Sequence, residues 1–399
     1  MSSTLPLGSK SVTDEVSTCP DVSVVMPCLN EAATVGACVE QIRRTFEQNR
    51  IAGEIIVADN GSTDNSVELA EKAGAQVVPV EQKGYGRALM AGIAAARGKY
   101  VIMGDADASY NFSQIPLFLE KLREGYDLVM GDRFAGGIAP GAMPSLHRYF
   151  GNPLLTAIGR FFFRSKCHDF YCGLRGFSKT AYENMSLRTT GMEFASEMVV
   201  KASLFRMPVC EVPTTLSPAG RGRKSHLRSW HDGFRGLRFL LLYSPRWLFL
   251  YPGVFLLVAG LATALWLLPG PRRVGHSFLD IHTLLYAVAA ILTGFQAVVF
   301  AFFTKVFGVT EGLLPEDPRL TRAFRVVNLE RGLFAGGILL LTGIGIASYS
   351  LYTWNRSGFG PMNPFLLVRL VAAALVSITL GVEIIFSSFF LSILSLARK

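Results

Sequence analysis

The sequence predicts an α/β domain, built on a Rossmann-like parallel sheet, followed by an α-helical membrane domain of about four spans. Three observations support this fold class. In the first part of the chain, short β-rich runs alternate with helical segments, the order that generates a parallel sheet covered by helices on both faces. The second part contains four apolar stretches that are each long enough to cross a bilayer. Charged residues, 17% of the chain, are concentrated before the first of these stretches.

The chain begins with a polar leader, residues 1–20, which lacks the apolar core of a signal peptide and which we expect to be disordered. The α/β domain is expected to occupy residues 21–213 and to stay in the cytosol. Its strands are predicted at Val22–Met26, Glu54–Ala58, Gln76–Val80, Tyr100–Met103 and Leu128–Met130. The helices between them are predicted at Thr34–Asn49, from the turn Asn60–Asp64 to Ala73, at Gly86–Arg97 and at Ser113–Glu124.

The membrane domain is expected to occupy residues 248–399. Its predicted spans are Leu248–Gly270, Ile281–Thr304, Gly332–Thr353 and Phe365–Ala397. If the α/β domain is cytosolic, the loop after the second span and the carboxyl-terminal tail are cytosolic too. These two segments carry more Lys and Arg than the two outer loops, which agrees with the positive-inside rule. We therefore expect an integral protein of a bacterial inner membrane, with both termini in the cytosol.

A basic segment, residues 214–247, joins the two predicted domains. Its position immediately before the first span favours attraction to anionic lipid headgroups or anionic substrates, so the net charge of +9 does not indicate nucleic-acid binding. Within it, Ser225–Trp247 alternates large apolar residues with arginines, which favours a helix lying in the membrane interface. An ordinary helix that packs between domains is the alternative. Two polar residues inside the spans, Gln296 and Glu383, mark a function or a contact between helices.

Polar residues gather where the predicted strands end. In open parallel sheets, ligands bind beyond the carboxyl ends of the strands, so this clustering predicts a binding site there. The residues concerned are Asn30-Glu31, Asp59-Asn60, Asp105–Asp107 and Asp132-Arg133.

The sharpest motif is Asp105-Ala106-Asp107, directly after an apolar strand. Carboxylates one residue apart in an extended segment point the same way and can hold a hard divalent cation that also bridges a diphosphate. A solvated turn is the alternative, since Asp-x-Asp occurs often by chance. Its position at a strand end favours a metal site for Mg²⁺ or Mn²⁺.

Three weaker motifs complete the predicted site. Pro27 ends the first strand, and Asn30 and Glu31 after it are placed to contact a ribose or base, although Asn-Glu also suits a helix entry. Asp59 is placed to bind the nucleoside, or serves only as the first residue of a turn and helix cap. Lys83-Gly84 precedes a helix without the third glycine of a dinucleotide fingerprint, which disfavours a dehydrogenase and favours close approach of the backbone to a nucleotide.

The cysteines give no metal site by their spacing. Cys167-His168 and Cys172 lie close together, but no second ligand pair follows at the spacing of a zinc finger or ribbon. All six cysteines belong to the part expected in the cytosol, where thiols are reduced. We interpret Cys167, His168 and Cys172 as packing residues.

In order along the chain, these motifs resemble those of family 2 glycosyltransferases of the GT-A fold. With the spans that follow, the chain is similar to polyprenyl-phosphate glycosyltransferases, which include dolichol-phosphate mannose synthases and undecaprenyl-phosphate sugar transferases. The motifs that carry the resemblance are Val24–Pro27 with Asn30-Glu31, Ala58–Asp64, Lys83-Gly84, Asp105–Asp107 and Gly131–Phe134.

The resemblance implies inverting transfer of a sugar from a UDP- or GDP-sugar to a polyprenyl phosphate on the cytosolic face of the membrane. It implies that Pro27, Glu31 and Asp59 bind the nucleoside, and that Asp105 and Asp107 bind the metal and the donor diphosphate. Arg133 and Arg148 would hold phosphate groups. In this reading Asp169 and Arg175 are the polar members of an acceptor-side segment, Asp169–Phe177, and Gly191–Glu197 lines the site opposite the metal. Arg175 and Glu193 have a second interpretation, as a structural ion pair.

The chain departs from the related enzymes at two positions. They often carry Asp-Ala-Asp-Leu-Gln, in which the Gln helps to coordinate the metal, whereas this chain has Ala108-Ser109 at the last two positions. They also carry a second Asp in the turn after the second strand, where this chain has Asn60. UDP and GDP donors, several sugars and several lipid lengths therefore stay open, as does assembly into a homo-oligomer.

Two other functions compete with this one. A processive polysaccharide synthase would carry Gln-x-x-Arg-Trp on an interface helix, and this chain has only the Arg246-Trp247 part of that motif. A transport or flippase subunit with a nucleotide-sensing domain would not need the Asp105 and Asp107 pair.

Overall fold

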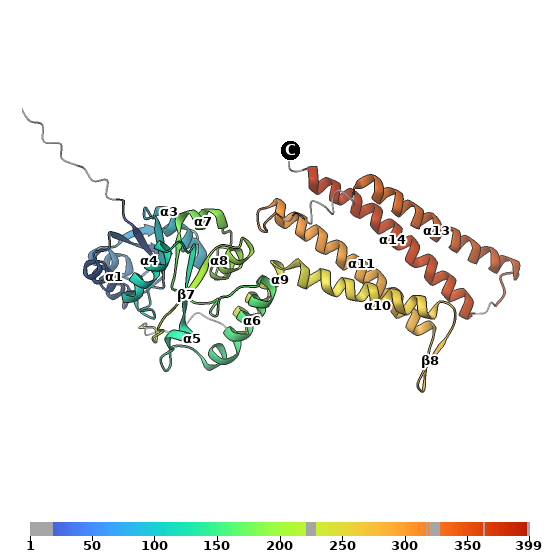
Figure 1. Cartoon of the computed structure of the whole chain (residues 1–399), viewed down its shortest axis with the longest axis horizontal. Helices are drawn as coiled ribbons and strands as arrows, with labels where there is room; N and C mark the ends of the chain where they lie inside the picture. The colour runs from blue at the N-terminus through green and yellow to red at the C-terminus, as the bar shows by residue number, and fades with distance from the viewer. Residues whose placement is uncertain (1–18, 221–228, 317, 319–327, 362–363, 397–399) are drawn as a thin grey trace, which may run out of the picture. The chain divides into compact units, whose positions relative to one another are not determined.

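The computed structural model describes residues 19–220, 229–316, 318, 328–361 and 364–396. Apart from Cys19 and Pro20, the predicted leader lies outside the described residues, as does the start of the predicted interface helix. The chain forms two compact units (Figure 1). The first contains residues up to Ala157, Lys166–Ala202 and Arg206–Ser229, and the second contains Ile158–Ser165, Ser203–Phe205 and Trp230–Lys399.

A seven-stranded sheet forms the centre of the first unit. Its strand order is β3-β2-β1-β4-β6-β5-β7, and every neighbouring pair is parallel except the two pairs that include β6. In this order the strands are Gln76–Pro79, Gly53–Asp59, Val22–Cys28, Tyr100–Met103, Arg175–Ser178, Leu128–Asp132 and Val209–Pro213. The five predicted strands are therefore present.

Helices cover both faces of the sheet, as predicted, because the central strands are apolar on both sides. Val22, Val24 and Met26 face one hydrophobic core, and Val25 faces another. The first core is completed by α1 (Val35–Asn49), α2 (Ser66–Lys72) and α4 (Ile115–Arg123), and the second by α3 (Tyr85–Ala95), α7 (Lys179–Met185) and α8 (Glu193–Leu204). Continuous apolar strands of this kind are typical of sheets buried on both faces.

Two details of the predicted sheet were wrong. Pro27 does not end β1, which runs on to Cys28; pairing with β4 stops at Val25, so the proline lies where only β2 is a partner. The sheet is also not purely parallel. The short strand β6 inserts antiparallel between β4 and β5. Neither β6 nor β7 was predicted. The sequence of β6, Arg-Gly-Phe-Ser, has no alternating pattern that would have marked it as a strand.

Among the described residues, the second unit contains four helices that are long and apolar enough to cross a membrane. They are Arg246–Leu267, Ile281–Thr310, Leu329–Arg356 and Phe365–Leu394, so four apolar helices follow the sheet domain, as predicted; the second extends beyond its predicted end at Thr304. In the labels of Figure 1 they are η3 (Arg246–Leu250) with α10 (Tyr251–Leu267), α11 (Ile281–Thr310), α13 (Leu329–Arg356) and α14 (Pro364–Leu396). A short hairpin, β8 (Arg272–Val274) and β9 (Ser277–Leu279), joins α10 to α11.

Glycines let the backbones of paired helices approach closely. A Cβ atom on Gly294 of α11 would lie 2.5 Å from the backbone nitrogen of Leu257 in α10, and one on Gly381 of α14 would lie 2.7 Å from that of Leu340 in α13. Small residues at such contacts are the usual basis of helix packing in lipid, where the hydrophobic effect does not drive helices together. The spans thus form two close pairs.

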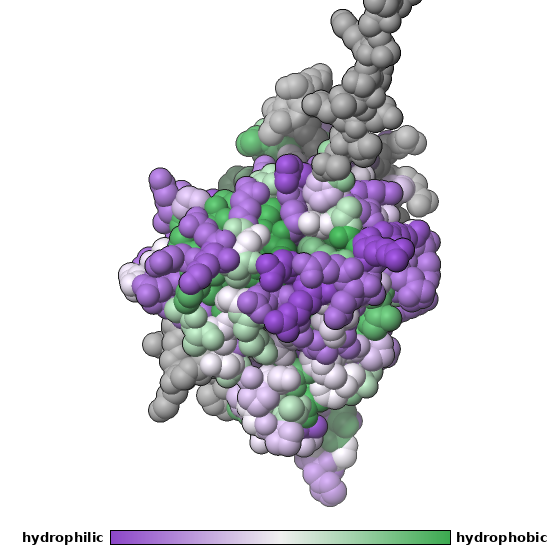
Figure 2. All heavy atoms as spheres, turned by 90° about the vertical axis from the view of Figure 1, so that its left-hand side faces the viewer, coloured by the Kyte–Doolittle hydropathy of each residue, from purple (hydrophilic) through white to green (hydrophobic). Residues whose placement is uncertain are grey.

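The outer faces differ between the units. Hydrophilic side chains dominate the face drawn in Figure 2. By contrast, apolar side chains are exposed along the four long helices, among them Phe255, Leu265, Phe334 and Phe386, each at least 60% exposed. Exposed apolar faces of this extent need an apolar environment, so the second unit is a membrane domain.

The four-span arrangement predicts which loops face outward. We expect His276→Cys, in the β8–β9 hairpin, and Ser357→Cys, after α13, to react with a membrane-impermeant thiol reagent in intact cells. Glu311→Cys, at the end of α11, should react only after permeabilisation. The last native cysteine along the chain is Cys210, well before the first span, so the native thiols should remain protected as an internal control. Labelling of Glu311→Cys from outside would overturn the topology.

Candidate functional site

The segment after β1 and the turn after β2 are bound to each other. Asn30 has a left-handed backbone (φ 56°), its N–H donates to Ser62 Oγ at 2.9 Å, and its side-chain oxygen accepts from Thr63 N at 2.7 Å. The N–H of Glu31 donates to Ser66 Oγ at 2.8 Å. Both segments follow neighbouring parallel strands, so they meet at the carboxyl edge of the sheet, where the sequence predicted a site.

Asp59 and Asn60 organise the next part of this edge. The Asp59 carboxylate accepts from the N–H groups of Gly61 and Ser62, both at 3.1 Å, so it caps its own turn. The Asn60 amide donates to Gln82 O at 2.9 Å and accepts from Gly84 N at 2.7 Å. An Asp at position 60 would lack the donor, because an ionised carboxylate only accepts. The departure from the related enzymes therefore fits a specific local contact.

Asp105 and Asp107 lie directly after β4. The hydroxyl of Tyr85, the first residue of α3, donates to Asp105 Oδ1 at 3.0 Å. Asp107 is 6% exposed, and its Oδ1 accepts from Ser109 N at 3.0 Å across Ala108, which has a left-handed backbone (φ 61°). Burial, followed by the Asp105 carboxylate, raises the pKa of Tyr85 well above its ordinary value. Tyr85 therefore keeps its proton and holds Asp105 across the physiological pH range.

The donor set of Asp105 and Asp107 fits a hard cation such as Mg²⁺ or Mn²⁺. Carboxylate oxygens are the ligands that such ions prefer, and Mg²⁺ in particular often takes only one or two carboxylates, with phosphate oxygens and water completing its shell. The Asp105 side chain is partly exposed at the strand end, and a Cβ atom on Gly173 would lie 2.8 Å from its Oδ2. The segment containing Gly173 thus approaches Asp105 closely.

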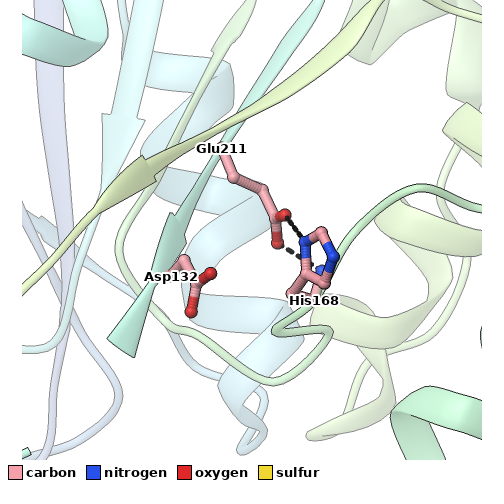
Figure 3. A group of neighbouring side chains, drawn as sticks. All are labelled: Asp132, His168 and Glu211. Atoms are coloured by element: carbon pink, nitrogen blue, oxygen red, sulfur yellow. Dashed lines mark hydrogen bonds and ion pairs between the residues drawn. The ribbon is translucent and has the colours of Figure 1, made fainter. Parts of the chain in front are cut away.

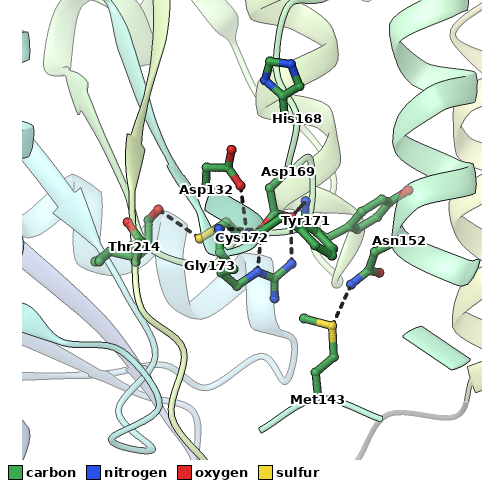
Figure 4. A network of polar contacts seen from close by, with 12 residues as sticks. Asp132, Met143, Asn152, His168, Asp169, Tyr171, Cys172, Gly173 and Thr214 are labelled. Carbon is green, nitrogen blue, oxygen red and sulfur yellow. Dashed lines mark hydrogen bonds and ion pairs between the residues drawn. The ribbon is translucent and has the colours of Figure 1, made fainter. Parts of the chain in front are cut away.

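Arg133 and Asp169 form a buried, bidentate ion pair. Arg133 Nε lies 2.6 Å from Asp169 Oδ2, and Nη2 lies 2.7 Å from Oδ1; the side chains are 8% and 0% exposed. Burial opposes the charge of Arg133, but Tyr110 and Asp169 outweigh burial and raise its pKa. The sequence predicted a phosphate contact for Arg133, whereas in the structure its main hydrogen bonds go to Asp169. Figure 4 shows the surrounding polar network.

Arg175 has a structural environment as well. It is fully buried in β6, donates from Nε and Nη2 to Cys172 O, and donates from Nη1 to Ala195 O at 2.6 Å. Burial lowers its pKa. The guanidinium of Arg175 is thus bonded to the backbone carbonyls of two neighbouring segments. Gly173, two residues earlier, donates its N–H to Tyr110 Oη at 2.7 Å.

Arg148 and Lys83 lie in more accessible positions. Arg148, in η2 (His147–Gly151), is partly exposed, stacks on the ring of Tyr149 at 5.4 Å and donates to Ile138 O at 3.4 Å. Lys83 is exposed immediately before Gly84, whose own φ of 149° is one that glycine adopts readily. Of the predicted site arginines, Arg148 is the one with an accessible guanidinium.

A second group of possible metal ligands was not predicted. Asp132, His168 and Glu211 each offer a ligand atom, all within 4.8 Å of one another (Figure 3). Glu211 Oε2 lies 2.6 Å from His168 Nδ1, and its Oε1 accepts from His168 N at 2.5 Å and Asp169 N at 3.1 Å. Asp132 Oδ1 caps α5 (Arg133–Gly136) through the N–H groups of Phe134 and Ala135. These protein contacts already explain the geometry.

The sequence could not bring this group together because Glu211 belongs to the unpredicted strand β7. Its parallel pairing with β5 places Glu211 opposite Met130, two residues before Asp132. His168 was considered only with its neighbouring cysteines, which are buried as packing residues, in agreement with the prediction. If Val209–Pro213 had been predicted as a strand beside β5, Glu211 would have been expected near Asp132.

Comparison with known proteins identifies the family. The model for glycosyl transferase family 2 matches residues 23–186, and the model for the family 2 C-terminal transmembrane region matches residues 302–395. The low-salt glycan biosynthesis hexosyltransferase of Haloferax volcanii is 38% identical over 374 residues, which cover 93% of this chain and 88% of the relative. The chain belongs to glycosyl transferase family 2. Its sheet is accordingly that of a GT-A-like domain, followed by the membrane domain of a membrane glycosyltransferase.

Two further relatives of this glycosyltransferase have polyprenyl phosphates in their names. The dolichyl-phosphate hexose transferase of Haloferax volcanii is 30% identical over 194 residues, which cover 48% of this chain and 81% of the relative. The undecaprenyl-phosphate 4-deoxy-4-formamido-L-arabinose transferase of Pseudomonas paraeruginosa is 31% identical over 215 residues, 51% of this chain and 60% of the relative. The resemblance read from the motifs is confirmed.

The Arg133–Asp169 pair leads to a stability prediction. Asp169→Asn leaves a buried guanidinium without its counter-charge, so we expect the first unit to lose about 3 kcal/mol of unfolding free energy. Urea unfolding of the purified chain, followed by circular dichroism, measures it. Glu124→Gln, which removes the exposed pair with Lys121 at 2.7 Å, is the matched control and should cost less than about 1 kcal/mol. Equal losses in the two variants would contradict the prediction.

The two candidate metal sites, Asp105 with Asp107 and the group of Asp132, His168 and Glu211, lead to different predictions for metal binding. We expect Asp107→Asn to weaken Mn²⁺ binding in the presence of UDP or GDP by about 100-fold and to abolish nearly all turnover while the protein still folds, because one of two anionic ligands is lost. His168→Ala should leave Mn²⁺ binding unchanged. Calorimetric titration measures both. Loss of binding in His168→Ala alone would move the metal to the Asp132, His168 and Glu211 group, and full turnover in excess chelator would exclude a metal.

Proposed function

We propose that this glycosyltransferase transfers a sugar from a UDP- or GDP-sugar to a polyprenyl phosphate at the cytosolic face of a bacterial inner membrane. The product, a polyprenyl-phosphate sugar, would serve glycoconjugate assembly. One observation carries the proposal: Asp105, at the carboxyl edge of the sheet, is held by Tyr85 beside the Asn60–Gly84 contact, in a chain that also has a membrane domain. Pro27, Glu31 and Asp59 lie at the same edge and are proposed to bind the nucleoside.

An exposed apolar helix face supports a lipid acceptor. The continuous helical stretch formed by η2 and α6 (Asn152–Phe163) exposes large apolar residues three and four positions apart, which places them on one face. Tyr149 is 74% exposed, and the others of this face are Leu146, Phe150 and Leu154. Phe161 and Trp247, which both belong to the second unit, lie 4.4 Å apart between ring centroids. An apolar face of this kind suits an interface with lipid.

The proposed reaction needs no general base, because the acceptor is already ionised. A lipid phosphate is ionised near neutral pH, since phosphate monoesters have a second pKa of about 6. It can attack the anomeric carbon without losing a proton, so the enzyme needs only to hold and orient it. A divalent cation at Asp105 and Asp107 would stabilise the charge on the leaving diphosphate. The single displacement inverts the anomeric centre.

The arginines divide between structure and substrate. Arg175 is fully buried on backbone carbonyls, and Arg133 is engaged by Asp169, so both support the positions of neighbouring segments. Arg148 is partly exposed on the same helical stretch as the apolar face. We therefore assign the acceptor phosphate contact to Arg148.

This assignment is tested by kinetics. We expect Arg148→Ala to raise the KM for the lipid phosphate by at least about tenfold, because a charge-assisted hydrogen bond is lost, with little change in the KM for the nucleotide sugar. Arg160→Ala, an exposed arginine of the same helical stretch, is the control and should change neither value by that much. The measurement is initial rates with radiolabelled nucleotide sugar and undecaprenyl phosphate in detergent, with UDP- and GDP-sugars tested in turn.

The linkage of the product tests the displacement itself. An α-linked donor should give a β-linked lipid phosphate, and no carboxylate outside the metal pair should be indispensable as a base. Nuclear magnetic resonance of the purified product determines the linkage. An α-linked product or a covalent sugar–enzyme adduct would show that the displacement is not single. Failure of every nucleotide sugar to label the lipid phosphate would overturn the proposed reaction.

A further inference from the structure

A fully buried ion pair lies within α8. Lys201 Nζ is 3.1 Å from Glu197 Oε1, the residues are one helical turn apart, and both side chains are 0% exposed. Replacing a buried ion pair with well-packed apolar residues is often neutral or stabilising, so stability alone does not account for such a pair. Its contacts with a neighbouring segment suggest a different role.

Both charges hold the segment Ser186–Thr189, which precedes α8. Lys201 Nζ donates to Ser186 O at 2.7 Å. Glu197 Oε2 accepts from Thr189 N at 2.8 Å and Thr189 Oγ1 at 2.6 Å, and also from Arg188 N at 3.0 Å. Four hydrogen bonds to charged groups thus fix this segment, each stronger than a bond between neutral groups.

The Ser186–Thr189 segment and Thr190, the next residue, pack closely against the start of α3. Arg87 N donates to Thr190 O at 3.2 Å. A Cβ atom on Gly84 would lie 2.5 Å from Thr190 O, and one on Gly86 would lie 2.6 Å from Thr189 O, so only glycine fits at either position without a shift of backbone. On its other side, Gly84 is held by Asn60. The backbone around Tyr85 is therefore clamped between two fixed groups.

Tyr85 connects this fixed backbone to the candidate site. It lies between the two glycines, and its hydroxyl donates to Asp105 Oδ1 at 3.0 Å. A displacement of the Thr189–Thr190 carbonyls would release the two glycines and move the Tyr85 hydroxyl away from Asp105. Hydrogen bonds weaken steeply as their geometry is lost, so a small displacement suffices.

We propose that Glu197 and Lys201 are positioning residues for the donor subsite: the ion pair fixes Ser186–Thr190, which fixes Gly84–Gly86 and so sets the Tyr85 hydroxyl on Asp105. This inference rests on the proposed function, in which Asp105 takes part in binding the metal and the nucleoside diphosphate. The resemblance placed Glu197 at the end of a stretch that lines the site, but its carboxylate is fully buried and accepts from Arg188 N and Thr189 N, so neither Glu197 nor Lys201 is assigned a contact with substrate. Their effect is on the geometry of Asp105.

A double-mutant cycle tests the inference. The dissociation constant of Mn²⁺ with UDP, and in parallel with GDP, is measured by calorimetry on the purified full chain. We expect Tyr85→Phe and Glu197→Gln each to weaken binding about tenfold, and the double variant to weaken it about tenfold rather than about 100-fold, because both changes break the same chain of contacts. Initial rates should show the KM for the nucleotide sugar raised and the KM for the lipid phosphate unchanged.

Glu54→Gln is the matched control. Glu54 also accepts several hydrogen bonds, from Ser23 Oγ at 2.6 Å, Arg97 N at 2.6 Å and Arg97 Nε at 2.9 Å, but it lies at the start of β2, at the opposite edge of the sheet. It should lower stability without changing nucleotide binding, and its combination with Tyr85→Phe should bind like Tyr85→Phe alone. Thr189→Val, which removes a single hydroxyl from Glu197, should weaken binding a few-fold and serves if Glu197→Gln does not fold.

The outcomes separate this inference from the proposed function. If the unaltered chain binds neither UDP nor GDP with Mn²⁺, the proposed function fails. If it binds one of them, but Glu197→Gln and Thr189→Val bind it as tightly as Glu54→Gln does, the positioning role is overturned. A double variant of Tyr85→Phe and Glu197→Gln that binds about 100-fold more weakly would also overturn it, because the two residues would then act independently.

Discussion

The buried contact between Arg133 and Asp169 is the interaction on which the candidate site depends most. Arg133 follows β5 directly, and Asp169 begins the segment that returns to the sheet as β6. Because that segment carries Gly173, whose backbone lies against Asp105 and Tyr110, the ion pair fixes one wall of the site. Desolvating two charges is costly, and here the cost is offset by bidentate geometry and by further N–H groups that donate to Asp169.

Much of this arrangement could be predicted from the sequence, because parallel strands impose it. The strands ending near Asp59, Asp105 and Asp132 are apolar and short, and helices separate them, so their ends had to meet at one edge. The contacts of Asn60 could not be predicted, since Gln82 and Gly84 are brought to it only by the path of the chain after β3. The antiparallel strand β6 was missed for a different reason: Arg175 is fully buried in it, against the usual preference of arginine for the surface.

The membrane domain shows the same division between what composition determines and what packing determines. Length and hydropathy were enough to place the four spans, because lipid demands helices with satisfied backbones. They say nothing about which helices pair. That information lies in single glycines such as Gly294 and Gly381, where the partner's backbone occupies the space of a side chain. A polar side chain also links the helices: Arg369, buried near the start of α14, contacts Asp280, which precedes α11, and donates to the carbonyl of Leu267 at the end of α10.

The Asn60 contact also bears on the chemical ageing of the protein. Asn60 is followed by Gly61, and an asparagine before a glycine is especially open to deamidation, in which the next backbone nitrogen attacks the side-chain amide. Here the Gly61 N–H is occupied by the Asp59 carboxylate, and both ends of the Asn60 amide are engaged by Gln82 and Gly84. The folded turn therefore protects Asn60-Gly61 from deamidation, whereas the unfolded chain would leave it unprotected. Each opening of this edge exposes the amide, and conversion to a carboxylate would remove the donor to Gln82 for the lifetime of that molecule.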